Sequence, residues 1–309
     1  MLPLTELSYK KTTLCEHSPY SFQLIVIIVI VIQVIIDPYK EEKYVSRPRY
    51  LEMSMLTRDE LDQPWDHKAN VDSKEIERFK ALADEWWNPN GKFRTVHNFN
   101  EERLRFIIQR IRTHFRHAPD NKTSIEGVKI LDVGCGAGLV SEPLAAAGAS
   151  VVGIDATSRN IEIAHNHAVQ SGHHVDYRHC LTEHLLKKES RFDVVLNLEV
   201  IEHVADPARL MSECCRLLTP GGLMIVATLN RTLLSFLVAI IGAEYVLHWL
   251  PIGTHDWKRF LHPQELTAMM TSHNMANHET IGITYNPLIR RWRISSNSRV
   301  NYLLVAEKR

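Results

Sequence analysis

An acidic strand end followed by three glycines forms the first group of residues that could do chemistry. Residues 132–138 read DVGCGAG. The spacing is G-x-G-x-G, and Leu139 occupies the position where the dinucleotide fingerprint G-x-G-x-x-G/A needs a third small residue. Asp132 would repel a pyrophosphate at the helix N-terminus that follows. The loop therefore favours S-adenosylmethionine (SAM), which carries a sulfonium and an ammonium and no phosphate; a tight turn without a ligand is the alternative.

A second acid ends the next predicted strand, seventeen residues after the last of these glycines. There the carboxylate of Asp155 could accept hydrogen bonds from both ribose hydroxyls of a nucleoside, which serves NAD and SAM equally. The loop and the two acids together resemble those of class I SAM-dependent methyltransferases. The resemblance implies that Gly134, Gly136 and Asp155 bind SAM. Residues 180–183, CLTE, stand where that family often has an acid for the adenine, so the adenine contact stays open.

The segment after the fourth predicted strand carries two carboxylates and an imidazole. In a helix, Glu199, Glu202 and His203 would share one face. Such a set could hold a divalent cation such as Mg²⁺, which would lower the pKa of a phenolic hydroxyl from about 10. Alternatively, His203 is a general base. In the third interpretation, Glu199 caps a helix and His203 is a packed polar side chain.

Strands and helices alternate around these residues. This alternation predicts an α/β fold: a Rossmann-like, doubly wound, mostly parallel seven-stranded sheet with helices on both faces. Two helices precede the sheet, one from Asn70 with Asp72 as N-cap and Pro89 as stop, and one over 100–117. The predicted strands are 128–133, 151–155, 175–179, 192–198, 223–228, 279–284 and 300–306. The predicted helices between them are 138–147, 158–170, 183–188, 208–218 and 263–273.

An apolar helical insertion follows the fifth predicted strand. Residues 231–253 are long enough for a transmembrane helix, but strands of one sheet flank them, so both ends lie on one side of any membrane. The insertion, 231–262 in full, could lie in a membrane interface through Phe236, Tyr245 and Trp249. It could instead cover a long-tailed substrate, or simply pack against the sheet. Basic residues that would suit anionic headgroups flank it: Arg231, Lys258 and Arg259.

Composition narrows the class of protein. The chain has 309 residues, with 36 Lys and Arg against 36 Asp and Glu, which gives no support for a nucleic-acid partner. Five cysteines without a C-x-x-C pair argue against a disulfide framework or a zinc site and favour a reducing compartment.

The first 68 residues differ from the rest. Residues 22–36 form an apolar run of fifteen, shorter than the roughly 20 that a spanning helix needs. The flanking acids argue against a mitochondrial transit peptide. The run is interpreted as a short membrane anchor or uncleaved signal, or as a poorly ordered leader outside the natural mature protein. Residues 37–68 read as a linker, and 69–309 as the methyltransferase domain.

From Asn70 to the C-terminus, the chain resembles the ubiquinone-biosynthesis O-methyltransferases of bacteria and mitochondria. The motifs that carry the resemblance are NVDSKEIERFKALADEWWNPNGKF, ILDVGCGAGL, EVIEHVADP, TLNRTLLSFLVAIIGAEYVL, GTHDWKRFLHP, ITYNP and VNYLL. It implies both O-methylation steps of the pathway, on polyprenylated catechols. The SAM-binding residues would be Arg103, Gly134, Asp155 and Leu198, with Arg103 on the methionine carboxylate. Magnesium would lie on Glu199, Glu202 and His203.

The resemblance also implies a cellular location and partners. Residues 231–253 would contact the membrane surface, within a multi-protein quinone-biosynthesis complex on the matrix side of the mitochondrial inner membrane. A bacterial cytoplasmic membrane face is the second choice, because the leader lacks the basic presequence of mitochondrial members. The rival functions are a methyltransferase for another small phenol or a carbon acid, a catalytically silent scaffold of that complex, and a dehydrogenase.

Overall fold

The structure is a computed structural model that describes residues 65, 69–88, 94–115, 125–246, 253, 255–286, 289 and 291–309. The predicted apolar run 22–36, nearly all of the linker 37–68 and the helix stop at Pro89 lie outside these residues. Among the described helices, none combines the length and the apolar character that crossing a bilayer requires.

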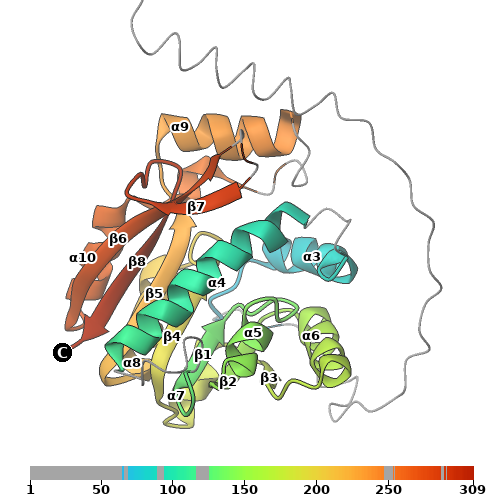
Figure 1. Cartoon of the computed structure of the whole chain (residues 1–309), viewed down its shortest axis with the longest axis vertical. Coiled ribbons are helices and arrows are strands. Elements are labelled where there is room, and N and C mark those ends of the chain that lie inside the picture. The colour runs from blue at the N-terminus through green and yellow to red at the C-terminus, as the bar shows by residue number, and fades with distance from the viewer. Residues whose placement is uncertain are drawn as a thin grey trace, which may run out of the picture. The chain divides into compact units, whose positions relative to one another are not determined.

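The described strands form one eight-stranded sheet in the order β3-β2-β1-β4-β5-β8-β6-β7 (Figure 1). Neighbours from β3 to β5 are parallel, and β8, β6 and β7 pair antiparallel. The α/β, mostly parallel prediction is therefore confirmed. The strands are β1 Lys129–Val133, β2 Ser150–Asp155, β3 Asp176–His179, β4 Phe192–Leu198, β5 Leu218–Leu229, β6 Met275–Asn286, β7 Arg291–Ser295 and β8 Asn301–Lys308.

The predicted number of seven strands was wrong, because β7 adds an eighth. This strand pairs only with β6 at the edge of the sheet, and its five side chains are exposed or half-buried. The sequence of β7, RWRIS, alternates polar and apolar residues as a strand does, and the prediction missed this signal.

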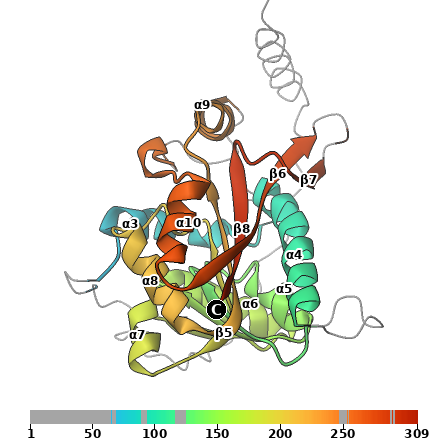
Figure 2. The ribbon, with the colours of Figure 1, turned by 90° about the vertical axis from the view of Figure 1, so that its left-hand side faces the viewer.

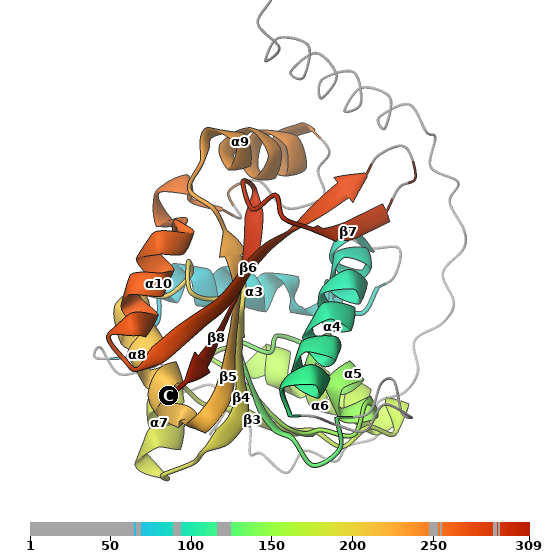
Figure 3. The same ribbon diagram turned by 60° about the vertical axis from the view of Figure 1, so that its left-hand side comes forward.

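Helices cover both faces of the sheet. Figures 2 and 3 show α4 and α5 on one side and α8 and α10 on the other. Ile107, Ile111 and Leu144 belong to the core on the first side, and Leu210 and Leu266 to the core on the second. The helices are α3 Ser73–Leu82, η1 Ala83–Glu85, α4 Arg94–His114, α5 Ser141–Ala146, α6 Ser158–Ser171, α7 Thr182–Lys187, α8 Pro207–Leu217, α9 Leu233–Ser235, η2 Phe236–Val246, η3 Trp257–Arg259 and α10 Pro263–Thr271.

Two of the helix starts follow from capping chemistry. Asp72 caps α3 as predicted, since its side chain accepts from the Lys74 N–H at 3.0 Å. Asp206 caps α8 in the same way through the Arg209 N–H at 3.0 Å, with Pro207 in the first turn. The helix predicted over 100–117 begins earlier than expected, at Arg94.

The insertion after β5 is helical, as predicted. A short α9 passes into the π-helix η2, and Figure 1 shows this segment beyond the ends of the strands. The Thr232 side chain accepts from the Ser235 N–H at 3.0 Å and so fixes the start of the insertion. Its residues 247–252 and 254, which include Trp249, lie outside the described part of the chain.

Candidate active site

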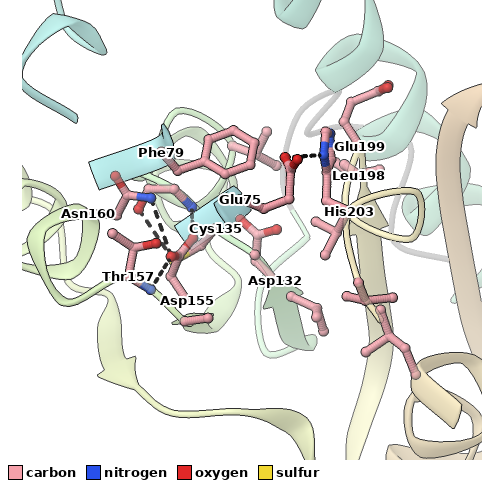
Figure 4. A pocket seen from close by; sticks show the side chains of 18 of the residues that line it. Glu75, Phe79, Asp132, Cys135, Asp155, Thr157, Asn160, Leu198, Glu199 and His203 are labelled. Carbon is pink, nitrogen blue, oxygen red and sulfur yellow. Dashed lines mark hydrogen bonds and ion pairs between the residues drawn. The ribbon is translucent and has the colours of Figure 1, made fainter. Parts of the chain in front are cut away.

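A cavity of about 410 Å³ lies at the carboxyl ends of β1, β2 and β4, where parallel sheets of this type bind ligands (Figure 4). It brings together seven of the eight predicted site residues: Arg103, Gly134, Gly136, Asp155, Leu198, Glu199 and His203. Glu202 is the exception. It borders a second, small cavity together with His203 and His255.

The glycine loop needs its glycines for conformation and for space. Gly134, Gly136 and Gly138 have φ of +68°, +55° and +90°, a region that favours glycine. A Cβ on Gly134 would lie 2.4 Å from Val200 Cγ2, and one on Gly138 would lie 2.1 Å from Tyr177 Oη. Substitution at either glycine would therefore strain the backbone, and a Cβ on Gly134 would also displace Val200 in the wall of the cavity.

Asp155 holds the loop and the start of α6 together at the floor of the cavity. Its Oδ2 accepts from the Gly136 N–H at 2.9 Å, and its Oδ1 from the Thr157 N–H at 2.7 Å and Asn160 Nδ2 at 3.3 Å (Figure 4). Burial raises the pKa of Asp155, and these hydrogen bonds oppose that rise. A carboxylate has about four acceptor positions, so ribose hydroxyls could still bind. That role stays a prediction.

Asp132 gives the cavity a second buried acid. Its Oδ2 accepts from Ser141 Oγ at 2.6 Å. Burial raises the pKa of Asp132 to about 6, Asp155 adds repulsion, and the nearby Arg103 opposes the rise. Two acids desolvated beside one cavity are stabilised by a positively charged ligand. The arrangement agrees with the argument from sequence for a sulfonium compound.

Arg103 reaches the cavity from α4. It is buried, its Nη1 lies 3.2 Å from Glu199 Oε1, and its Nη2 donates to Asn100 Oδ1. Burial lowers the pKa of Arg103, and the charges of Glu199 and Asp132 oppose that shift. Its Nε has no hydrogen-bond partner within the described residues. A buried guanidinium with a free donor is a suitable partner for the methionine carboxylate, as the resemblance implies.

The residues after β4 form a turn and not a helix. Glu199 has φ of +57°, so the shared helical face of Glu199, Glu202 and His203 does not form. Glu199 pairs with Arg103, and neither Glu202 oxygen has a partner in the part of the chain that the structure describes. Burial and the neighbouring Glu199 raise the pKa of Glu202 well above its usual range.

The three predicted metal ligands thus have three different environments. Within the described ranges, no group of three or more His, Cys, Asp or Glu side chains is placed to hold a metal ion. In this arrangement the residues do not fit the predicted magnesium site.

His203 is oriented by a residue that sequence analysis missed. Its Nδ1 lies 2.9 Å from Glu75 Oε2 of α3, and the Phe79 ring meets it edge-on at 5.2 Å (Figure 4). Burial alone would raise the pKa of Glu75, but the hydrogen bond and charge of His203 contribute to a net lowering. The sequence carried no signal for this contact, since an acid in a first helical turn usually complements the helix dipole.

Three further segments complete the cavity wall. Trp86 lies next to Gly136, and Trp87 Nε1 donates to Ala137 O at 2.8 Å, so these tryptophans cover the glycine loop. Residues 180–183, whose contact with the adenine the sequence did not decide, line the cavity. So do three small or apolar residues of the insertion, Val238, Ala239 and Ala243.

Comparisons with known proteins agree with this geometry. Residues 131–226 match the model of a methyltransferase domain family. The chain is 49% identical over 245 residues to the ubiquinone biosynthesis O-methyltransferase of Chelativorans sp. (strain BNC1), covering 79% of this chain and 97% of that relative. It is 47% identical over 241 residues to the enzyme of that name from Brucella anthropi, covering 78% and 97%. The chain belongs to the ubiquinone biosynthesis O-methyltransferase family.

A solved structure supports the fold of this family member. Magnesium protoporphyrin IX methyltransferase from Synechocystis PCC 6803, with bound SAH, superimposes with a TM-score of 0.53 at 15% identity, covering 77% of this chain and 94% of that one. At this identity the likeness concerns the class I methyltransferase fold alone. Family membership and the methyltransferase domain identify the chain as a SAM-dependent O-methyltransferase.

Proposed function

We propose that the protein methylates a ring hydroxyl of polyprenylated catechols in ubiquinone synthesis, in both O-methylation steps. The observation that carries the proposal is the composition of one cavity. Its cofactor end is bounded by Asp132 and Asp155, and its other walls include His203 and apolar residues of the insertion such as Val238. The two acids therefore suit a positively charged methyl donor, and the apolar residues suit the tail of an acceptor in the same cavity.

The reaction is a displacement at the SAM methyl carbon. The catechol oxygen forms the new C–O bond while the bond from sulfur to the methyl carbon breaks. The products are a methoxy ring, neutral S-adenosylhomocysteine and one proton. Because Glu75 accepts at Nδ1 of His203, the neutral imidazole has its lone pair on Nε2 and can take that proton. Glu199, paired with Arg103, would hold the guanidinium toward the cofactor.

Magnesium stays a prediction from the resemblance. A bound divalent ion would lower the pKa of the acceptor hydroxyl. Since Glu199, Glu202 and His203 do not converge in the described residues, no step is assigned to it. Turnover measured after EDTA treatment, and again after MgCl₂ is restored, decides the matter. Loss and recovery would show that a metal-bound arrangement of these three side chains exists.

The insertion is proposed to contact the membrane surface. Leu233 is 72% exposed and Tyr245 54% exposed, and Val238 and Ile241 are also exposed, an apolar set that suits an interface. Two of the three basic residues expected at headgroups have partners within the protein: Arg231 with Glu265, and Arg259 with Asp72 at 2.6 Å. The apolar side chains therefore carry this proposal, and liposome flotation with a Leu233→Ser and Tyr245→Ser variant tests it.

The location and the assembly are proposals from the resemblance. The proposed location is the matrix side of the mitochondrial inner membrane, and the proposed assembly is a multi-protein quinone-biosynthesis complex. The two relatives named above are bacterial and lend the mitochondrial location no support. Fractionation of the source cells, followed by chemical cross-linking of the membrane fraction, tests both.

Three experiments test the central proposal. Calorimetry should show SAM binding and no binding of NADH, whereas the reverse would favour a dehydrogenase. Purified protein should then methylate a short-tailed catechol, and a longer tail should raise kcat/KM. A rate indifferent to the tail would favour another phenolic acceptor. A His203→Ala variant that still supports quinone production in cells would favour a scaffold.

A further inference from the structure

A second histidine faces the acceptor end of the cavity. His255 belongs to the GTHDW segment in the second half of the insertion, and it lines both the main cavity and the small one. The main cavity is also lined by His203, and the two imidazole centroids lie 6.5 Å apart. Nothing in the chemistry described above uses His255.

His255 is held by a buried carboxylate from the insertion. Its Nδ1 lies 2.9 Å from Oε1 of Glu244, whose side chain is fully buried. Glu244 also accepts from the backbone N–H of Gly253 at 2.6 Å and of His255 at 2.9 Å. Three donors thus satisfy an acid that would be costly to bury alone.

This contact determines which nitrogen of the imidazole carries the hydrogen. A carboxylate oxygen only accepts, so Nδ1 of His255 carries the proton, and the lone pair of the neutral ring lies on Nε2. His203 has the same construction, with Glu75 in place of Glu244. Two imidazoles, each held by its own glutamate and each with an accepting Nε2, therefore line one cavity.

We propose that His255 binds the catechol hydroxyl adjacent to the one that is methylated. The proposal rests on the proposed function. A catechol presents two neighbouring hydroxyls, and each can make a hydrogen bond of about 2.8 Å to an acceptor. His203 takes the proton of the attacking oxygen, while the neighbouring hydroxyl keeps its proton and donates it to His255 Nε2. His255 then determines which oxygen faces the SAM methyl, and the residue acts as a specificity determinant.

A purely structural role for His255 makes a different prediction. The ring also contacts Phe260 edge-on at 5.8 Å, so its loss could simply loosen the insertion. Loosening would lower stability and affect all acceptors alike. Only direct binding of a hydroxyl discriminates between acceptors that have the second hydroxyl and those that lack it.

The test uses His255→Asn in the full-length protein. The Asn side-chain amide can donate to Glu244 as Nδ1 does, but it has no atom in place of Nε2. With a short-tailed catechol we expect kcat/KM to fall about tenfold and the single methylated isomer to become a mixture. With the analogue that lacks the adjacent hydroxyl, the kcat/KM of wild type and variant should differ by less than about twofold, because neither protein can form the hydrogen bond to that hydroxyl. His114→Asn, on α4, is the matched control and should change neither quantity.

A second variant leaves His255 in place. In Glu244→Gln the amide oxygen can take the place of Oε1, where it still accepts from the backbone N–H and from Nδ1 of His255, so the ring hydrogen stays on Nδ1. This variant removes the charge of Glu244 and keeps the acceptor at Nε2, so it should still give a single isomer. SAM affinity, measured by calorimetry, should stay within about twofold of wild type for each folded variant, since neither residue is placed against the cofactor.

Each outcome bears on one claim. If His255→Asn binds SAM and keeps both the isomer ratio and the kcat/KM of wild type, the role of His255 is overturned. An equal loss on both acceptors would also overturn it, in favour of a structural role. If the wild-type protein binds SAM but methylates no catechol, the proposed function fails first, and the inference fails with it.

Discussion

The two ends of the cavity are built in different ways. The cofactor end is built mainly from one stretch of chain, from Asp132 to Asn160, in which Asp155 accepts from backbone N–H groups of that stretch, and Arg103 joins it from α4. The acceptor end joins side chains from distant segments: Glu75 pairs with His203 across 128 residues. Local sequence therefore determines where the donor binds, whereas the long-range fold determines where the acceptor binds. The two ends should respond separately to mutation.

Gly138→Ala should have the largest effect, at the cofactor end. The added Cβ meets Tyr177 Oη at 2.1 Å with φ of +90°. Strain and overpacking of this kind cost about 3 kcal/mol together, so the free energy of unfolding should fall by about that amount. Urea denaturation measures this free energy. Gly172→Ala is the control, since Gly172 has φ of +70° but nothing within 4 Å of the added atom. Equal losses in the two variants would mean that backbone strain alone is responsible.

Asp132→Asn should stabilise the protein without its cofactor. Burial raises the pKa of Asp132 from 3.8 to about 6. The native state therefore holds a proton that the unfolded state releases, and this contribution to stability falls as pH rises from about 4 to 6. Two pKa units correspond to about 3 kcal/mol, which Asn should recover at pH 8 and not at pH 4. Urea denaturation at the two pH values measures it; a gain at pH 4 of the same size would contradict the explanation.

Asp155→Asn should weaken SAM binding by about thirtyfold. The amide nitrogen of Asn would face one of the N–H donors of Gly136 and Thr157, and a hydrogen bond to a charged acceptor contributes about 2 kcal/mol. Asp193→Asn, whose carboxylate accepts from the Lys129 N–H at the opposite end of β1, is the control. Unchanged SAM affinity in Asp155→Asn would remove Asp155 from the cofactor site.

Glu75→Gln should have the smallest effect on activity, and it should affect the acceptor end of the cavity without affecting the cofactor end. It removes the charge that orients His203, so kcat should fall about tenfold, while SAM affinity stays as in wild type. Glu77→Gln, an exposed neighbour on α3, is the control. A matching loss of SAM affinity in Glu75→Gln would show that the two ends are coupled, and the comparison above would be wrong.

The sequence predicted the fold better than the acceptor site. Apolar strands, the glycine loop and Asp155 leave local patterns, and all are found where they were expected. The edge strand β7 also leaves a pattern, the alternation RWRIS, but the prediction missed it. The turn at Glu199 is a non-glycine residue at positive φ, which no residue pattern announces. Glu75 and His255 acquire partners only through tertiary contacts.

The buried Glu244 has a consequence for how such enzymes diversify. Its hydrogen bonds join the helix η2 of the insertion to Gly253 and His255 later in the same insertion. A chimera that exchanged η2 alone with a relative lacking this acid would leave the histidine unsupported. Segments 231–246 and 253–255 are therefore expected to be inherited as one cassette, and grafting them together is the way to transplant acceptor preference onto another methyltransferase scaffold.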